Sequence, residues 1–94
     1  MTNIEDIKQL VRASGSVGAN YIEANEALSK KDFIYRIKVC RKESKESRYF
    51  LRLVDTNANP SFNQERKVLI QEATELMKIF GAIITKSEKP KEVL

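Results

Sequence analysis

The sequence contains no histidine, no tryptophan and a single cysteine among its 94 residues. Without histidine the chain lacks the usual general base and the commonest metal ligand, so histidine-dependent catalysis is excluded. Cys40 alone forms neither an internal disulfide nor a thiolate cluster, which favours a reducing, cytoplasmic location. No stretch is apolar over the about 18 residues that a membrane span needs, and the N-terminus lacks the pattern of a signal peptide.

Glycine and proline are also scarce, with three and two copies, while 41% of the residues are hydrophobic and 32% are charged. Such a composition is typical of a compact helical chain, and the length predicts one domain over residues 1–94. Apolar residues at spacings of three and four predict helices over 4–28, 30–54 and 61–85. Residues 86–94 are mostly charged and include a proline, so we expect a solvated tail there.

The second predicted helix has the clearest pattern. Ser29 followed by Asp32 is a capping box, and similar signatures at Asn3 with Asp6 and at Ser61 with Gln64 predict the starts of the other two helices. The apolar seam of this second helix follows a strict alternation of four- and three-residue steps, which is typical of a helix that packs against other helices. The seam consists of Phe33, Ile37, Cys40, Ser44, Ser47, Leu51 and Val54.

Two glycines interrupt the first predicted helix, and each costs about 1 kcal/mol relative to alanine. Gly15 and Gly18 resemble a phosphate-binding loop, but the lysine and the preceding strand of such a loop are absent. The structural interpretation is that they let two helix backbones approach closely, opposite Ser44 and Ser47.

Positive charge is concentrated on the second predicted helix. Residues 30–55 hold nine bases and four acids, whereas residues 1–29 hold two bases and four acids. Six cations recur at helical spacing opposite the apolar seam, and such a row can neutralise the phosphates of a nucleic acid. The alternative is an ordinary solvated face, because Glu43 and Glu46 lie beside it. The candidate nucleic-acid-binding residues are Lys31, Lys38, Arg41, Lys45, Arg48 and Arg52, with Tyr49 as an aromatic that could stack on a base.

A polar row at Ser16, Asn20 and Glu23 could join Glu43 or Glu46 in a network between helices. Paired carboxylates can also perform acid–base chemistry or hold a metal, but the di-iron helical bundles need Glu-x-x-His motifs. We therefore predict a structural network, no catalytic residue, no metal, no cofactor and no enzymatic activity. An enzyme that uses Glu23 and Glu46 is the most distant hypothesis.

Four segments together resemble one family: Ser14–Asn20, Tyr21–Ala24, Ser29–Phe33 and Cys40–Glu46. They are similar to the S23-type four-helix-bundle proteins encoded by intervening sequences of bacterial 23S ribosomal RNA genes. The resemblance covers about Leu10 to Val54 strongly and continues more weakly to about Lys86. It implies that the small and polar residues of the family pattern are structural: Ser16, Gly18, Asn20, Glu23, Ser29, Asp32, Phe33 and Glu46.

The resemblance further implies an all-α, antiparallel up-and-down bundle that assembles into a ring-shaped homo-oligomer, in known cases a pentamer, in the bacterial cytoplasm. The accessory variability proteins of diversity-generating retroelements, a related branch, bind nucleic acid and a reverse transcriptase through a basic surface. Family members usually begin with a helix that is missing or shortened here, which leaves an apolar flank. Two functions are expected: RNA or DNA binding through the basic row, or a structural or adaptor module that engages another protein.

Overall fold

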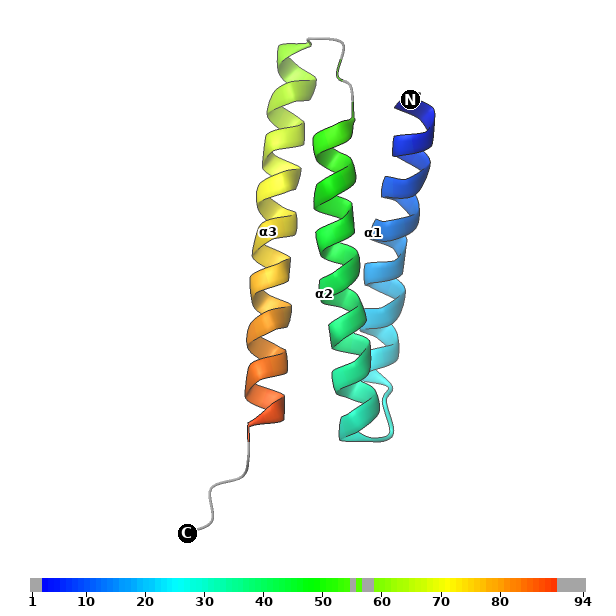
Figure 1. Ribbon diagram of the computed structural model, residues 1–94, viewed down its shortest axis with the longest axis vertical. Coiled ribbons are helices and arrows are strands. Elements are labelled where there is room, and N and C mark those ends of the chain that lie inside the picture. Colours follow the sequence, from blue (N-terminus) through cyan, green and yellow to red (C-terminus); the bar gives the residue numbers. More distant parts are fainter. Residues whose placement is uncertain (1–2, 55, 57–58, 90–94) are drawn as a thin grey trace.

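The structure is a computed structural model that describes residues 3–54, 56 and 59–89. These residues form three α-helices and no strand: α1 (Asn3–Asn25), α2 (Lys30–Leu53) and α3 (Pro60–Glu88). The helices run side by side in alternating directions, with α2 between α1 and α3 and packed against both (Figure 1). The predicted all-α class and the up-and-down order of the three helices are confirmed.

The helix ends differ from the predicted ones by a few residues. α1 ends at Asn25 rather than at residue 28, and the amides of Glu26 and Ala27 bond to carbonyls three residues back, at Glu23 and Ala24. Such bonds tighten the last turn and end the helix. α3 continues to Glu88, three residues beyond the predicted end, so the first part of the predicted tail is helical. Residues 90–94 of that tail lie outside the described residues.

Two helix starts are fixed by side-chain caps. Ser29 caps α2 as predicted, because its hydroxyl oxygen accepts a hydrogen bond of 3.0 Å from the amide of Asp32. The prediction for α3 is wrong, since Asn59 and not Ser61 is the cap. Its side-chain oxygen accepts from the amides of Ser61 and Phe62 at 2.9 and 3.1 Å. Pro60 then occupies the first helical position. An amide at this position has no partner within the helix, so the missing N–H of proline costs no hydrogen bond.

The core lies where the C-terminal halves of α1 and α3 meet the N-terminal half of α2. The cluster of buried residues consists of Ala24, Ile37, Cys40, Phe80 and Ile84, with Val17, Phe33 and Ile83 packed around it. Phe33, Ile37 and Cys40 belong to the predicted seam of α2, so the contribution of this helix to the core follows directly from its helical periodicity.

The other half of the molecule is open. A groove of about 310 Å³ lies between α1 and α3, with the small side chains of Ser44 and Ser47 on α2 among its lining. Both serine hydroxyls donate to carbonyls of their own helix, at Cys40 and Glu43, which satisfies them without a partner helix. The walls are mainly apolar and include Leu10, Val17, Leu51, Leu69, Ala73 and Leu76.

The glycines do not lie where the sequence predicted. A Cβ atom built on Gly15 or on Gly18 would meet no atom within 4 Å, so neither residue allows a close approach to α2. The buried small residues of α1 are instead Ala13 and Ala24, and Ala24 packs in the cluster with Ile37 and Cys40 of α2. Gly18 follows Val17 by one residue, and this step of about 100° turns it away from α2.

In the isolated chain, replacing Gly18 with alanine is therefore expected to stabilise the fold by about 0.5–1 kcal/mol. The added methyl group meets no neighbour, and alanine has less backbone entropy to lose. The free energy of unfolding from urea titration measures this effect. As a matched control, Ala19→Gly on the same exposed side should lose a similar amount. A loss of stability in Gly18→Ala would mean that another chain packs on this face.

Across the part of the chain that the structure describes, none of the helices combines the length and the apolar character needed to span a membrane.

Candidate nucleic-acid interface

The cations of the predicted row come together on the side of α2 that faces away from the core. Lys31, Lys38 and Lys45 follow one another at seven-residue intervals, and all three are exposed. Arg41 and Arg48 form a parallel row nearer to α3, where the guanidinium of Arg48 donates to Thr74 Oγ1 at 3.4 Å. Arg52 continues the surface toward the end of α2 and is also exposed.

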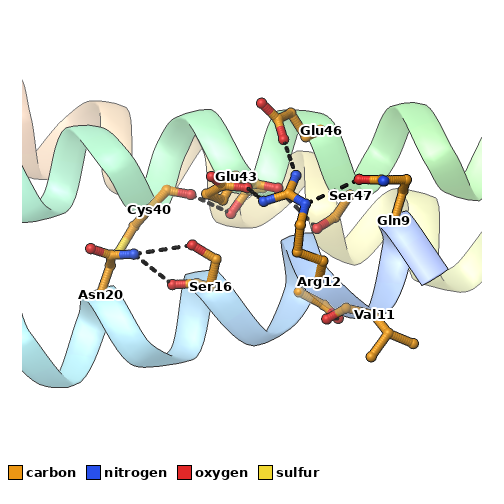
Figure 2. Close-up of polar contacts among 11 residues, drawn as sticks. Gln9, Val11, Arg12, Ser16, Asn20, Cys40, Glu43, Glu46 and Ser47 are labelled. Atoms are coloured by element: carbon orange, nitrogen blue, oxygen red, sulfur yellow. Dashed lines mark hydrogen bonds and ion pairs between the residues drawn. The ribbon is translucent and has the colours of Figure 1, made fainter.

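The two glutamates beside this row are turned toward α1: Glu43 is buried against it, and Glu46 lies at the edge of the row, in the same hollow as Lys45. Figure 2 shows the guanidinium of Arg12 between the two helices, with both carboxylates turned toward it. Arg12 Nη2 lies 2.6 Å from an oxygen of Glu46, and Nη1 lies 3.4 Å from an oxygen of Glu43. The arginine also donates from Nε to Gln9 at 3.1 Å, which fixes the plane of its side chain.

Arg12 compensates a charge that is otherwise costly to bury. Glu43 is only 7% exposed, and a buried carboxylate without a cation loses several kcal/mol of hydration. The hydrogen bond to Glu46, together with the charges of both glutamates, raises the pKa of Arg12 above its usual value despite some desolvation. Both acids are thus engaged with α1, and the outer face of α2 keeps its positive charge.

One cation of the row has an acidic partner on α3. Lys38 Nζ lies 3.0 Å from a carboxylate oxygen of Glu88, and both side chains are about half exposed. Exposed pairs of this kind contribute little and exchange easily for other partners. Within the described residues, Lys31, Arg41, Lys45 and Arg48 form no ion pair.

Two tyrosines are exposed near the cations. Tyr49 is 58% exposed and meets the ring of Phe50 edge to face, with the ring centroids 5.2 Å apart. It lines a shallow hollow together with Lys45. Tyr35 is 57% exposed, and the guanidinium of Arg36 lies 5.5 Å from its ring centroid. Tyr49 is therefore exposed beside Lys45, at a hollow that Arg12 and Glu46 also line.

The predicted polar network forms only in part. Asn20 Nδ2 donates to the carbonyl and to the hydroxyl oxygen of Ser16 at 2.9 and 3.1 Å (Figure 2). Its Oδ1 accepts from Arg36 at 3.1 Å. Glu43 and Glu46 do not join this group, because they bind Arg12 further along the helix pair. Glu23 is exposed on α1. The structure thus separates Glu23 from Glu46, and the two form no shared carboxylate site.

The remaining residues of the family pattern serve α2 or lie on the surface. Ser29 caps the helix, and Phe33 packs against the core cluster. Asp32 lies 3.9 Å from Arg36 one turn later, close enough for a weak ion pair. Gly18 faces open space. No group of three acidic or thiol side chains in the described ranges is placed to hold a metal ion.

Cys40 is enclosed in the core and is poorly suited to act as a nucleophile. Its Sγ lies 3.6 Å from the carbonyl oxygen of Val17, to which the thiol donates. Burial raises the pKa of the Cys40 thiol above its usual value, so the reactive thiolate is disfavoured in the folded protein.

We expect Cys40 to react with a thiol reagent only when the chain unfolds. The same pKa shift predicts a fall in stability above about pH 8.5, because the unfolded thiol then loses its proton while the folded one keeps it. Reaction rates at about pH 8, with and without urea, measure the first effect. Fast labelling of the native protein would contradict the enclosed position, and Cys40→Ser provides the unlabelled control.

Arg12 is the residue of this region that the sequence did not reveal. It is one of only two bases in the first 29 residues, and its partners lie 31 and 34 positions further along the chain. The available signal was a pair of acids three residues apart on the facing helix, but it becomes meaningful only when the register between α1 and α2 is known.

Comparisons with known proteins agree with this architecture. None of the curated proteins matches the sequence. A crystal structure of a protein of unknown function from the S23 ribosomal protein family of Bacteroides thetaiotaomicron is similar, with 32% identity and a TM-score of 0.71. The similarity covers 82% of this chain and 70% of that one. The model of the 23S rRNA-intervening sequence protein family matches residues 3–82. The predicted resemblance is confirmed: this chain belongs to the 23S rRNA-intervening sequence protein family.

Proposed function

We propose that this protein is a non-enzymatic, cytoplasmic nucleic-acid-binding protein that contacts RNA or DNA through the outer face of α2. The observation that carries the proposal is the row of cations without acidic partners. Arg41, Lys45 and Arg48 form no ion pair in the described structure, whereas Glu43 is buried against α1 and Glu46 is paired with Arg12 at the edge of the row.

This arrangement suits a phosphate backbone. Cations in a row along one helix can each contact a phosphate and release a bound counterion, which provides affinity without sequence selection. Tyr49 adds a flat, exposed ring next to Lys45, and such a ring can stack on an unpaired base. The link of the family to 23S rRNA intervening sequences is consistent with an RNA ligand.

The experiment is fluorescence anisotropy with a labelled RNA hairpin and a labelled duplex DNA at about 50 mM and about 200 mM salt. If six cations contact phosphates of the duplex, its affinity should fall about 10³-fold between these conditions. Comparison of the two ligands identifies the preferred nucleic acid. Lack of binding to either at the lower salt concentration would overturn the proposal.

A second proposal concerns assembly, and it rests on the open side of the bundle. Ile4, Val11 and Ile22 on α1 are each more than 60% exposed, and Ile79 on α3 is 53% exposed. These side chains extend the apolar surface beside the groove between α1 and α3, where a fourth helix would complete the bundle. We propose that another copy of this chain covers this surface in a homo-oligomer, with a pentamer as the expected size.

Light scattering during size-exclusion chromatography tests the assembly. A mass several times that of one chain supports it, and a monomer at micromolar concentration contradicts it. In the monomeric case the apolar side of the bundle would instead be the surface for an adaptor role toward a different protein. Capture of a partner that resists nuclease and moderate salt would distinguish that role from nucleic-acid binding.

A further inference from the structure

A second basic feature lies next to the outer face of α2, in a groove that α2 forms with α3. The groove has a volume of about 370 Å³ and is open to solvent on one side. None of the described residues that line it is acidic. The lining consists of Arg41, Arg48, Thr74, Met77, Lys78, Gly81 and Thr85.

The three cations of this groove come from two helices. α2 and α3 are antiparallel, and Arg48 touches Thr74, so Arg41 is level with Gly81 seven residues further along α3. Lys78 lies between these two levels on α3. The groove thus presents a cation at each end of one wall and a third cation midway along the other, over about 10.5 Å of helix length.

The uncharged groups of the groove do not neutralise its cations. Thr74 and Thr85 donate their hydroxyl hydrogens to carbonyls of their own helix, at Ile70 and Gly81, so an anion in the groove would depend on the cations for its donors. Thr74 Oγ1 accepts from Arg48 and holds that side chain against α3. Gly81 has no Cβ, and an added one would meet nothing within 4 Å, so the floor opposite Arg41 stays open.

We infer that this groove is a binding site for phosphate groups. Arginine provides paired N–H donors that match phosphate oxygens, and lysine adds a point charge to the same anion. The site deepens the proposed function, and it depends on that function if the phosphates belong to a nucleic acid. It adds α3 to an interface that the sequence placed on α2 alone, and the open shape lets a continuous backbone pass through. A free polyphosphate would present the same chemistry.

Lys78→Gln tests the site, because Lys78 lies outside the predicted α2 row and its exposed side chain is not needed for folding. Lys67→Gln is the matched control: it removes one exposed lysine from the same helix outside this groove. For duplex DNA, Lys78→Gln should reduce the slope of log affinity against log salt by about one, and Lys67→Gln should leave the slope unchanged.

Inorganic pyrophosphate, followed by NMR on the Nε–Hε signals of Arg41 and Arg48, tests the groove without a nucleic acid. We expect both signals to shift, with about tenfold weaker binding in Lys78→Gln. Shifts without any DNA or RNA binding would support a polyphosphate site and reject the proposed function. A different result would overturn the phosphate site and leave the proposed function standing. In that case nucleic acid binds, both lysine variants have the same slope of log affinity against log salt, and pyrophosphate shifts neither arginine signal. Absence of both kinds of binding would overturn both.

Discussion

Reversing Arg41, Lys45 and Arg48 to glutamate is expected to weaken nucleic-acid binding strongly. Each reversal removes a phosphate contact and adds a repulsive charge, so the affinity for duplex DNA at about 50 mM salt should fall by about 10²-fold or more. These three residues are the best choice because they form no ion pair in the described structure, whereas Lys38 pairs with Glu88. Anisotropy with the ligands used for the unmodified protein measures the loss.

The control must distinguish the effect of where the charges lie from the effect of the net charge of the protein. Three reversals change the net charge from +4 to −2, and reversal of Lys8, Lys86 and Lys89 gives the same net charge. All three lysines are exposed and none belongs to the predicted row: Lys8 lies on α1, and Lys86 and Lys89 lie at the end of α3. If both variants lose binding equally, the affinity depends on total charge, and the outer face of α2 is not an interface. Circular dichroism should show unchanged helix content in both.

Phe80→Ala is expected to be the most destabilising single substitution in the core, at about 3–5 kcal/mol. Phe80 is 4% exposed, lies in the cluster with Ile37 and Cys40 of α2, and has its ring centroid 6.3 Å from that of Tyr21 on α1. Its ring therefore joins all three helices. Because domains of this size have about 5–15 kcal/mol of total stability, the variant should unfold at a much lower urea concentration.

Phe62→Ala in the same helix is the matched control. Phe62 is 56% exposed, so the same chemical change should cost less than about 1 kcal/mol. If Phe80→Ala were as stable as Phe62→Ala, the three helices would not share one core. A large loss in Phe62→Ala instead would indicate that this exposed ring is covered by another chain.

The sequence was most informative where one helix determines its own structure. The bounds of α2, its cap at Ser29 and its buried seam follow from local chemistry, and the structure agrees to within one residue. The start of α3 is also a matter of local chemistry, although the capping-box signature at Ser61 predicts it wrongly. Proline favours the first helical position, so Pro60 is the local signal that points to Asn59 as the cap.

Features that depend on two helices were not predictable in this way. The orientation of Gly18 depends on which face of α1 meets α2, and small size alone does not identify that face. The contacts of Glu43 and Glu46 with Arg12 depend on the same register. The groove at Lys78 could be predicted only if the offset of α3 along α2 were known. A single sequence fixes the period of each helix but not the offset between helices.

The middle position of α2 also has a consequence for how the chain folds. Both helix pairs are hairpins of neighbours in sequence, α1 with α2 and α2 with α3, and they share one central helix (Figure 1). Contacts between such neighbours have low contact order, and helical chains of this kind reach the native state in microseconds to milliseconds. Either hairpin can nucleate, but neither forms without α2. We therefore expect substitutions in the buried seam of α2 to slow folding, and those in the outer halves of α1 and α3 mainly to speed unfolding.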